Sequence, residues 1–99
     1  MTPYILPPAE DDLDKAVEYY SEIDSDLANR LLTEFERVVR WLPDHPELYR
    51  ERPEGYRRVN LKIFPYYVAF IVRVDKLVVV AFASSSLPVD WLERLPSST

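Results

Sequence analysis

The spacing of apolar residues changes from a helical to a strand-like period along this 99-residue chain, and this change narrows the possible folds. In the first part, apolar side chains recur every three or four residues, which places them on one face of a helix. Later they alternate with polar side chains or form short unbroken runs, as in β-strands. This pattern predicts a single α+β domain over residues 1–99, with helices packed on one face of a small, mostly antiparallel sheet.

The residues before Pro43 predict an N-terminal antiparallel helical hairpin. One helix is expected at residues 9–22, and a second runs from the polar break at residues 24–26 to about residue 42. Because the break is short, the two helices should pack against each other. Their apolar stripes consist of Leu13, Ala16, Val17 and Tyr20 in the first helix and Leu27, Leu31, Phe35, Val38 and Leu42 in the second.

Strands and a final short helix complete a β-α-α-β-β-β-α order. The strands are expected at residues 4–6, 56–64, 66–73 and 77–83. Alternation in the second strand directs Val59, Leu61 and Ile63 to one face and polar side chains to the other. The last strand is almost entirely apolar and should be buried on both faces. Pro88 is expected to open the final helix, which contains Trp91.

Composition excludes several kinds of site. The chain has no cysteine and one histidine, His45, which excludes a thiolate or multi-histidine metal site. The single glycine excludes Gly-rich phosphate cradles, so we expect neither a metal nor a cofactor. The sequence contains no apolar run near the roughly 18 residues of a membrane span and no signal-peptide pattern. We therefore expect a cytoplasmic protein with no membrane partner.

Charge is distributed unevenly around a net value of −5. Residues 1–36 carry ten acidic and two basic side chains, whereas residues 50–62 carry five basic and two acidic side chains. Because a binding face is set by local charge, the acidic total does not exclude an anionic target. The sequence predicts a cationic face on the strand that begins near residue 56.

Three side chains on or beside that strand are candidate catalytic groups. Arg58 and Lys62 flank Asn60 on the outward face, and Tyr66 follows Pro65. Cleavage of RNA by its 2′-hydroxyl needs a base, a cation for the phosphate and an acid. Lys62, Arg58 and Tyr66 would take these roles in that order. In the alternative interpretation, Arg58 and Lys62 are ordinary surface charges that only increase the solubility of the protein.

Short motifs spread from Tyr4 to Arg94 form a wider pattern. They are Ala9…Asp12-Leu13…Tyr19-Tyr20, Ala28…Leu32…Phe35, Leu42-Pro43…Pro46, Tyr56-Arg57-Arg58, Phe64-Pro65-Tyr66, Val78-Val79-Val80-Ala81 and Pro88…Trp91…Arg94. With these motifs the chain resembles the RelE/ParE superfamily of bacterial type II toxins, the plasmid stabilisation proteins. The resemblance implies the toxin component of a toxin–antitoxin system, which forms a hetero-oligomer with a cognate antitoxin that neutralises it.

The same resemblance leaves the mode of action open. Some members cleave messenger RNA on the ribosome, some poison DNA gyrase, and some retain only partner binding. Members typically end the last strand with His-x-Arg-Arg-x-Pro, but here Ala83, Ser85 and Ser86 occupy the His and Arg positions. This departure favours gyrase-type or other non-nucleolytic growth inhibition, and a protein that is not an enzyme.

Two alternatives remain at this stage. In the first, the chain is a catalytically silent family member that acts only as a protein-interaction module. In the second, which is less favoured, it is an mRNA endoribonuclease with a rearranged site formed by Arg58, Lys62 and Tyr66. Trp41 lies beside the apolar stripe of its helix, where it is either peripheral core or an interface anchor. The candidate target or partner contacts are Arg57, Arg58, Tyr19, Trp41 and Trp91.

Overall fold

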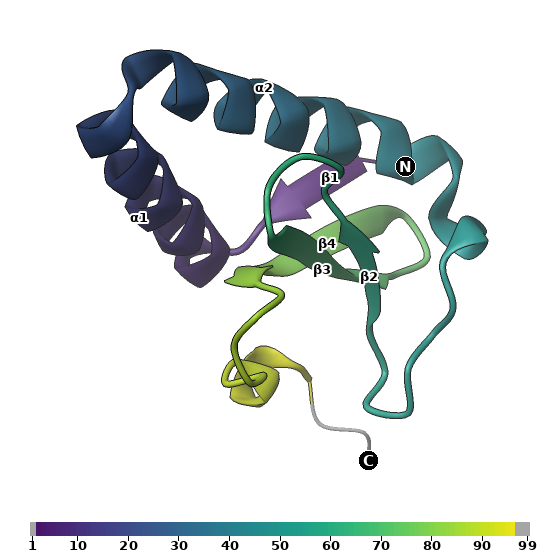
Figure 1. Cartoon of the computed structure of the whole chain (residues 1–99). Helices are drawn as coiled ribbons and strands as arrows, with labels where there is room; N and C mark the ends of the chain where they lie inside the picture. Colours follow the sequence, from purple (N-terminus) through teal and green to yellow (C-terminus); the bar gives the residue numbers. More distant parts are fainter. Residues whose placement is uncertain (1, 97–99) are drawn as a thin grey trace.

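Two helices cover one face of a four-stranded sheet in the computed structural model, which describes residues 2–96 (Figure 1). The main elements are β1 (Thr2–Ile5), α1 (Pro7–Ile23), α2 (Ser25–Trp41), β2 (Arg57–Asn60), β3 (Tyr66–Val72) and β4 (Lys76–Ser84). Short 3₁₀ turns occur at Leu42–Asp44 (η1), Pro46–Leu48 (η2) and Leu92–Arg94 (η3). The α+β architecture, with its helical hairpin before the main strands, confirms the prediction. None of the helices in residues 2–96 is long and apolar enough to cross a membrane.

The sheet has the strand order β1-β4-β3-β2. β1 runs parallel to β4, while β2, β3 and β4 form antiparallel pairs. The expected short N-terminal strand is therefore present at one edge, and β2 forms the other edge. A bulge between Ala69 and Phe70 shifts the β3–β4 register, which is a common way to increase local twist.

Local sequence signals explain the helical hairpin. Pro7 and Pro8 begin α1, where a missing N–H costs nothing. Asp24 alone separates α1 from α2, and its side chain caps α2 by accepting a 2.9 Å hydrogen bond from the Asp26 amide. The helices diverge from this turn across the sheet (Figure 1). Pro43 follows α2 directly and continues the chain as a 3₁₀ turn.

The main core lies between the helices and the sheet. It joins Leu31 and Phe35 of α2 to Val59 and Leu61, as the two periodicities predict. The Phe35 ring meets Phe82 of β4 edge to face, with 5.3 Å between ring centroids. One apolar layer therefore lies between α2, whose apolar side chains repeat about every 3.6 residues, and the sheet, whose inward side chains repeat every 2 residues.

A second core lies on the opposite face of the sheet, beneath residues 85–96. Trp91 is 1% exposed there, and its Nε1–H donates a 2.9 Å hydrogen bond to the Tyr67 hydroxyl. β4 is therefore buried on both faces, as its apolar run predicts. The final helix expected from Pro88 is reduced to the turn η3, because the segment crosses the sheet to place Trp91 against Tyr67.

The predicted 56–64 strand is too long. β2 ends at Asn60, and the Leu61 amide closes the following turn by a 2.9 Å hydrogen bond to the Tyr66 carbonyl. Alternation fails after this point because the chain reverses direction and Pro65 has no N–H for a strand ladder. Ile63 is consequently 68% exposed rather than in the core, while Phe64 is buried.

Candidate functional site

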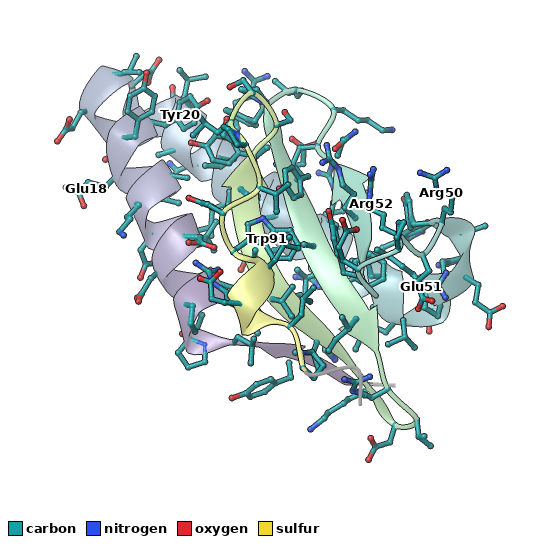
Figure 2. All side chains as sticks on the ribbon, turned by 90° about the horizontal axis from the view of Figure 1, so that it is seen from below. Glu18, Tyr20, Arg50, Glu51, Arg52 and Trp91 are labelled. Carbon is teal, nitrogen blue, oxygen red and sulfur yellow. The ribbon has the colours of Figure 1, made fainter. Side chains whose placement is uncertain are left out.

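Arg58 lies on the sheet face that carries the second core. Its guanidinium carbon is 3.9 Å from the Tyr67 ring centroid, and its Nη2 donates a 3.0 Å hydrogen bond to Asn60 Oδ1. Figure 2 views the molecule from below, with Trp91 central and Arg52 on the loop to its right. Burial raises the pKa of Tyr56, while the positive charge of Arg52 opposes this shift. The Arg58 guanidinium, held on the Tyr67 ring, is therefore placed where it could contact an anionic or planar group of another molecule.

Tyr66 faces the helices, away from Arg58. Its ring stacks on Phe82 at 4.9 Å and meets Tyr20 at 6.3 Å, both in the main core. Burial raises the pKa of the Tyr66 hydroxyl, which weakens it as an acid at neutral pH. The next residue, Tyr67, is the one beside Arg58, because successive strand residues face opposite sides of a sheet.

Lys62 lies in a third environment, beyond the end of β2. Its backbone N–H donates a 2.8 Å hydrogen bond to Glu34 Oε2 of α2. Its side chain lines a groove beside α2 together with Arg30 and Arg37. The structure therefore does not bring Arg58, Lys62 and Tyr66 together as sequence reasoning expected, since the turn after Asn60 separates them.

The other predicted contacts differ in accessibility. Tyr19 is 59% exposed on α1, and Trp41 is 39% exposed at the end of α2. The Trp41 indole stacks on His45, with 4.2 Å between centroids. Arg57 Nη1 donates a 2.7 Å hydrogen bond to the Tyr49 carbonyl, which holds it against the preceding loop. Trp91 is a core residue in this fold and presents almost no contact surface.

The end of β4 contains a small serine turn. The hydroxyls of Ser84 and Ser86 are 2.9 Å apart, and the Ser86 amide donates to Ser84 Oγ. The Ser85 amide donates to the Pro65 carbonyl, which ties this turn to the start of β3. The turn satisfies backbone groups and contributes no ionisable side chain at the positions of Ala83–Ser86.

A groove between α2 and β2 was not recognised from the sequence. It consists of two adjoining hollows that share Glu34, Arg37 and Lys62. A signal was available, because polar and aromatic residues recur at helical spacing beside the apolar stripe of α2. The residues in question are Arg30, Glu34, Arg37 and Trp41.

A family model described as the ParE toxin of the type II toxin–antitoxin system, parDE, matches residues 4–86. The chain belongs to the ParE toxin family. It is 36% identical over 62 residues to Toxin ParE2 of Mycobacterium tuberculosis, in strains CDC 1551 / Oshkosh and H37Rv. This match covers 62% of the chain and 59% of the relative, so the chain spans about three fifths of the curated relatives it matches.

A solved structure supports the ParE fold independently. A chain from the chromosomal ParDE TA system of P. aeruginosa superposes with a TM-score of 0.75, covering 85% of this chain and 95% of that one. Sequence identity is 19%, so the likeness establishes the fold alone. The family model, together with the Toxin ParE2 relatives, confirms the RelE/ParE resemblance of the sequence.

A charged contact that the sequence did not predict joins Asp12, inside the residues matched by the family model, to Arg94, which lies beyond them. Asp12 Oδ2 of α1 accepts a 2.7 Å hydrogen bond from Arg94 Nη1 and a 3.1 Å bond from the Phe82 amide. Arg94 Nη1 also donates to the Val80 carbonyl at 3.0 Å. The hydrogen bond to Asp12 raises the pKa of Arg94. These bonds cover part of the β4 edge that extends past β1 and anchor the C-terminal segment.

Proposed function

We propose that this ParE-family chain inhibits bacterial growth by a gyrase-type or other non-nucleolytic mechanism and is neutralised by a cognate antitoxin in the cytoplasm. The observation that carries the first part is the separation of Arg58, Tyr66 and Lys62. They lie respectively on the second sheet face, in the helix-side core and in the groove beside α2. Transfer of a proton and stabilisation of a phosphate need such groups within hydrogen-bond reach of one scissile bond.

The serine turn supports the same conclusion. Ala83, Ser85 and Ser86 occupy the positions where RelE/ParE members typically carry histidine and arginines. At neutral pH, alanine and serine supply neither a cation nor an efficient base. Arg58 and Arg57 remain suitable for contact with a macromolecular target, because electrostatic recognition needs charge but no proton transfer.

Growth inhibition and its neutralisation can be tested together. We expect arrest when the chain is induced alone in a bacterial host, and recovery when the product of a short neighbouring reading frame is produced with it. Copurification of the two proteins would demonstrate the pair. Continued growth at full accumulation of the chain alone would instead support a silent interaction module.

The target needs two purified assays. Added to translating ribosomes, the protein should leave messenger RNA intact. Added to DNA gyrase, it should cause cleaved plasmid to accumulate, or should stop the supercoiling of relaxed plasmid. Codon-specific cleavage that Lys62→Ala or Arg58→Ala abolishes would contradict the non-nucleolytic proposal and restore the nuclease alternative.

A further inference from the structure

We infer that an apolar hollow with a cationic rim, on the sheet face opposite the helices, receives an apolar side chain flanked by acidic residues of the target protein. The inference rests on the proposed function, because it takes the target of growth inhibition as the partner. The hollow has a volume of about 290 Å³ and lies where β1, β4 and β3 run side by side. It is thus separate from the groove beside α2.

The floor of the hollow is a row of side chains that crosses three strands. Tyr4 of β1 is paired with Val78 of β4, which is paired with Ile71 of β3. Paired residues point to the same face of a sheet, and Ile71 and Val78 belong to the second core. Tyr4 is 50% exposed. The row therefore extends the second core to the β1 edge, where a partner can reach it.

The C-terminal segment covers only part of this sheet face. Trp91 bonds to Tyr67 in the second core, while Pro96 of the same segment forms one border of the hollow. Arg58, which the sequence assigned to target contact, lies over the Tyr67 ring on the same face. A target that contacts Arg58 thus meets the side of the sheet on which the hollow opens.

Two cations form the rim of the hollow at the β3–β4 turn. Strand alternation places Arg73 on the face of Ile71 and Lys76 on the face of Val78. The Arg73 amide donates a 2.8 Å hydrogen bond to the Lys76 carbonyl, which fixes the two residues relative to each other. Lys76 Nζ is 5.9 Å from the Tyr4 ring centroid. Both charges are therefore held beside the apolar floor.

The chain does not neutralise these two cations. Neither Arg73 nor Lys76 forms an ion pair within residues 2–96. Asp75 belongs to the same turn but does not line the hollow, and no carboxylate does so among the described residues. The groove beside α2, by contrast, contains Glu34. In a chain of net charge −5, a hollow lined only by apolar and basic residues favours an anionic partner.

The apolar floor favours a protein segment over a nucleic acid. Phosphates would satisfy the rim, but a nucleic-acid backbone would leave Ile71 and Val78 without an apolar partner. A leucine or phenylalanine side chain would be buried against the floor, and carboxylates beside it would pair with the rim. Protein interfaces commonly place one anchor side chain in such a pocket.

Three peptides test the inference on the complete protein. The probe is acetyl-Gly-Glu-Leu-Glu-Gly-amide. One control carries lysine in place of both acids, and the other carries serine in place of leucine. In amide NMR titrations, the probe should shift the signals of Ile71, Arg73, Lys76 and Val78, with an affinity about tenfold or more above that of either control.

Two results of the titrations would overturn the inference. One is equal binding of all three peptides, or no shift at these amides with the acidic leucine peptide. The other is a shift of the same amides by a short oligothymidylate but not by the peptide, which would make the hollow a nucleic-acid site.

Charge-reversal variants connect the hollow to the target. Arg73→Glu with Lys76→Glu should raise the amount of protein needed for growth arrest by about tenfold or more, because attraction becomes repulsion at two contacts. Copurification with the neighbouring gene product should persist, which also shows that the variant is folded. The matched control, Lys15→Glu with Arg40→Glu, reverses two exposed charges on α1 and α2 and should stay within about twofold of the wild type.

The outcomes separate this inference from the proposed function. If both double variants arrest growth as the wild type does, the inference fails while the proposed function stands. If the wild type does not arrest growth, the proposed function fails, and the peptides alone decide whether the hollow binds an acidic apolar segment.

A milder variant covers the case in which charge reversal abolishes copurification as well as arrest. Arg73→Gln with Lys76→Gln removes the attraction without adding repulsion, so it should weaken arrest and keep copurification. Loss of copurification in this variant too, with the fold retained by circular dichroism, would assign the hollow to the neutralising partner and overturn the inference.

Discussion

Tyr66 and Tyr67 are adjacent in the sequence but stabilise opposite faces of the sheet. Tyr66 stacks on Phe82 beneath the helices, while Tyr67 accepts a hydrogen bond from Trp91 and lies under Arg58. The difference follows from the alternation of side chains in β3. It also determines which hydroxyl matters for stability, since only that of Tyr67 satisfies a buried donor.

Tyr67→Phe should therefore lower the free energy of unfolding by about 1–3 kcal/mol, because it leaves the Trp91 Nε1–H buried without its acceptor. Tyr66→Phe is the matched control, since no hydrogen bond involving its hydroxyl occurs in the part of the chain that the structure describes. It should cost less than about 0.5 kcal/mol. Urea unfolding measures both, and equal losses would contradict the assignment of Trp91 to the second core.

The raised pKa of Tyr66 also predicts that the folded protein loses stability at alkaline pH. Burial raises the pKa of this phenol above its ordinary value of 10.0, so the unfolded chain releases its proton first as pH rises. The contribution of the protonated Tyr66 phenol to the free energy of unfolding is fully present below its pKa in the unfolded chain. This contribution is lost as pH rises through its pKa in the folded chain. Urea midpoints measured from pH 8 upward should decline above about pH 10. The decline should be shallower in Tyr66→Phe, and identical curves would contradict this.

At the scale of elements, α2 presents two distinct faces. One face supplies Leu31 and Phe35 to the main core, and an adjacent face carries Arg30 and Arg37 along the groove. The helical period separates these faces, so the groove side chains can be changed without removing a core contact. A variant on one face need not disturb the other.

Leu31→Ala should cost about 2–5 kcal/mol, because Leu31 is fully buried and its removal leaves a cavity. Leu32→Ala is the control on the same helix, since Leu32 is 37% exposed and its loss should be less than half as large. Denaturant unfolding of both proteins tests the orientation of α2. A greater loss from Leu32→Ala would show that the helix is rotated from the described position.

At the scale of the molecule, the Asp12–Arg94 pair joins the first helix to the C-terminal segment. The two side chains are about one fifth exposed. Asp12 accepts a hydrogen bond from the Phe82 amide, and Arg94 donates one to the Val80 carbonyl, both on β4. The pair connects two residues that are 82 positions apart, so most of the domain lies between them in sequence. The contact thus links α1 to the segment that carries Trp91 of the second core.

A double-mutant cycle of Asp12→Ala and Arg94→Ala should give a coupling free energy of about 0.5–3 kcal/mol. The reason is that each single change removes the same hydrogen bonds and leaves the other group partly buried. Unfolding measurements on the four proteins provide the cycle. Strict additivity would show that the pair does not hold the C-terminal segment in solution.

The sequence by itself determined the order of the elements and the main core. The shared burial of Leu31, Phe35, Val59 and Leu61 follows from local periodicity, because a repeat of 3.6 or 2 residues reports which face of an element is covered. Even the short edge strand was predictable, since its apolar triplet precedes a proline pair.

Only the tertiary structure decided where the charged and aromatic groups lie relative to one another. The turn after Asn60 interrupts strand alternation, so Lys62 reaches α2 while Arg58 stays on the second face. Asp12 and Arg94 meet although 82 positions separate them. Periodicity describes the exposure of each element alone, whereas a site depends on turns and long-range contacts that bring elements together.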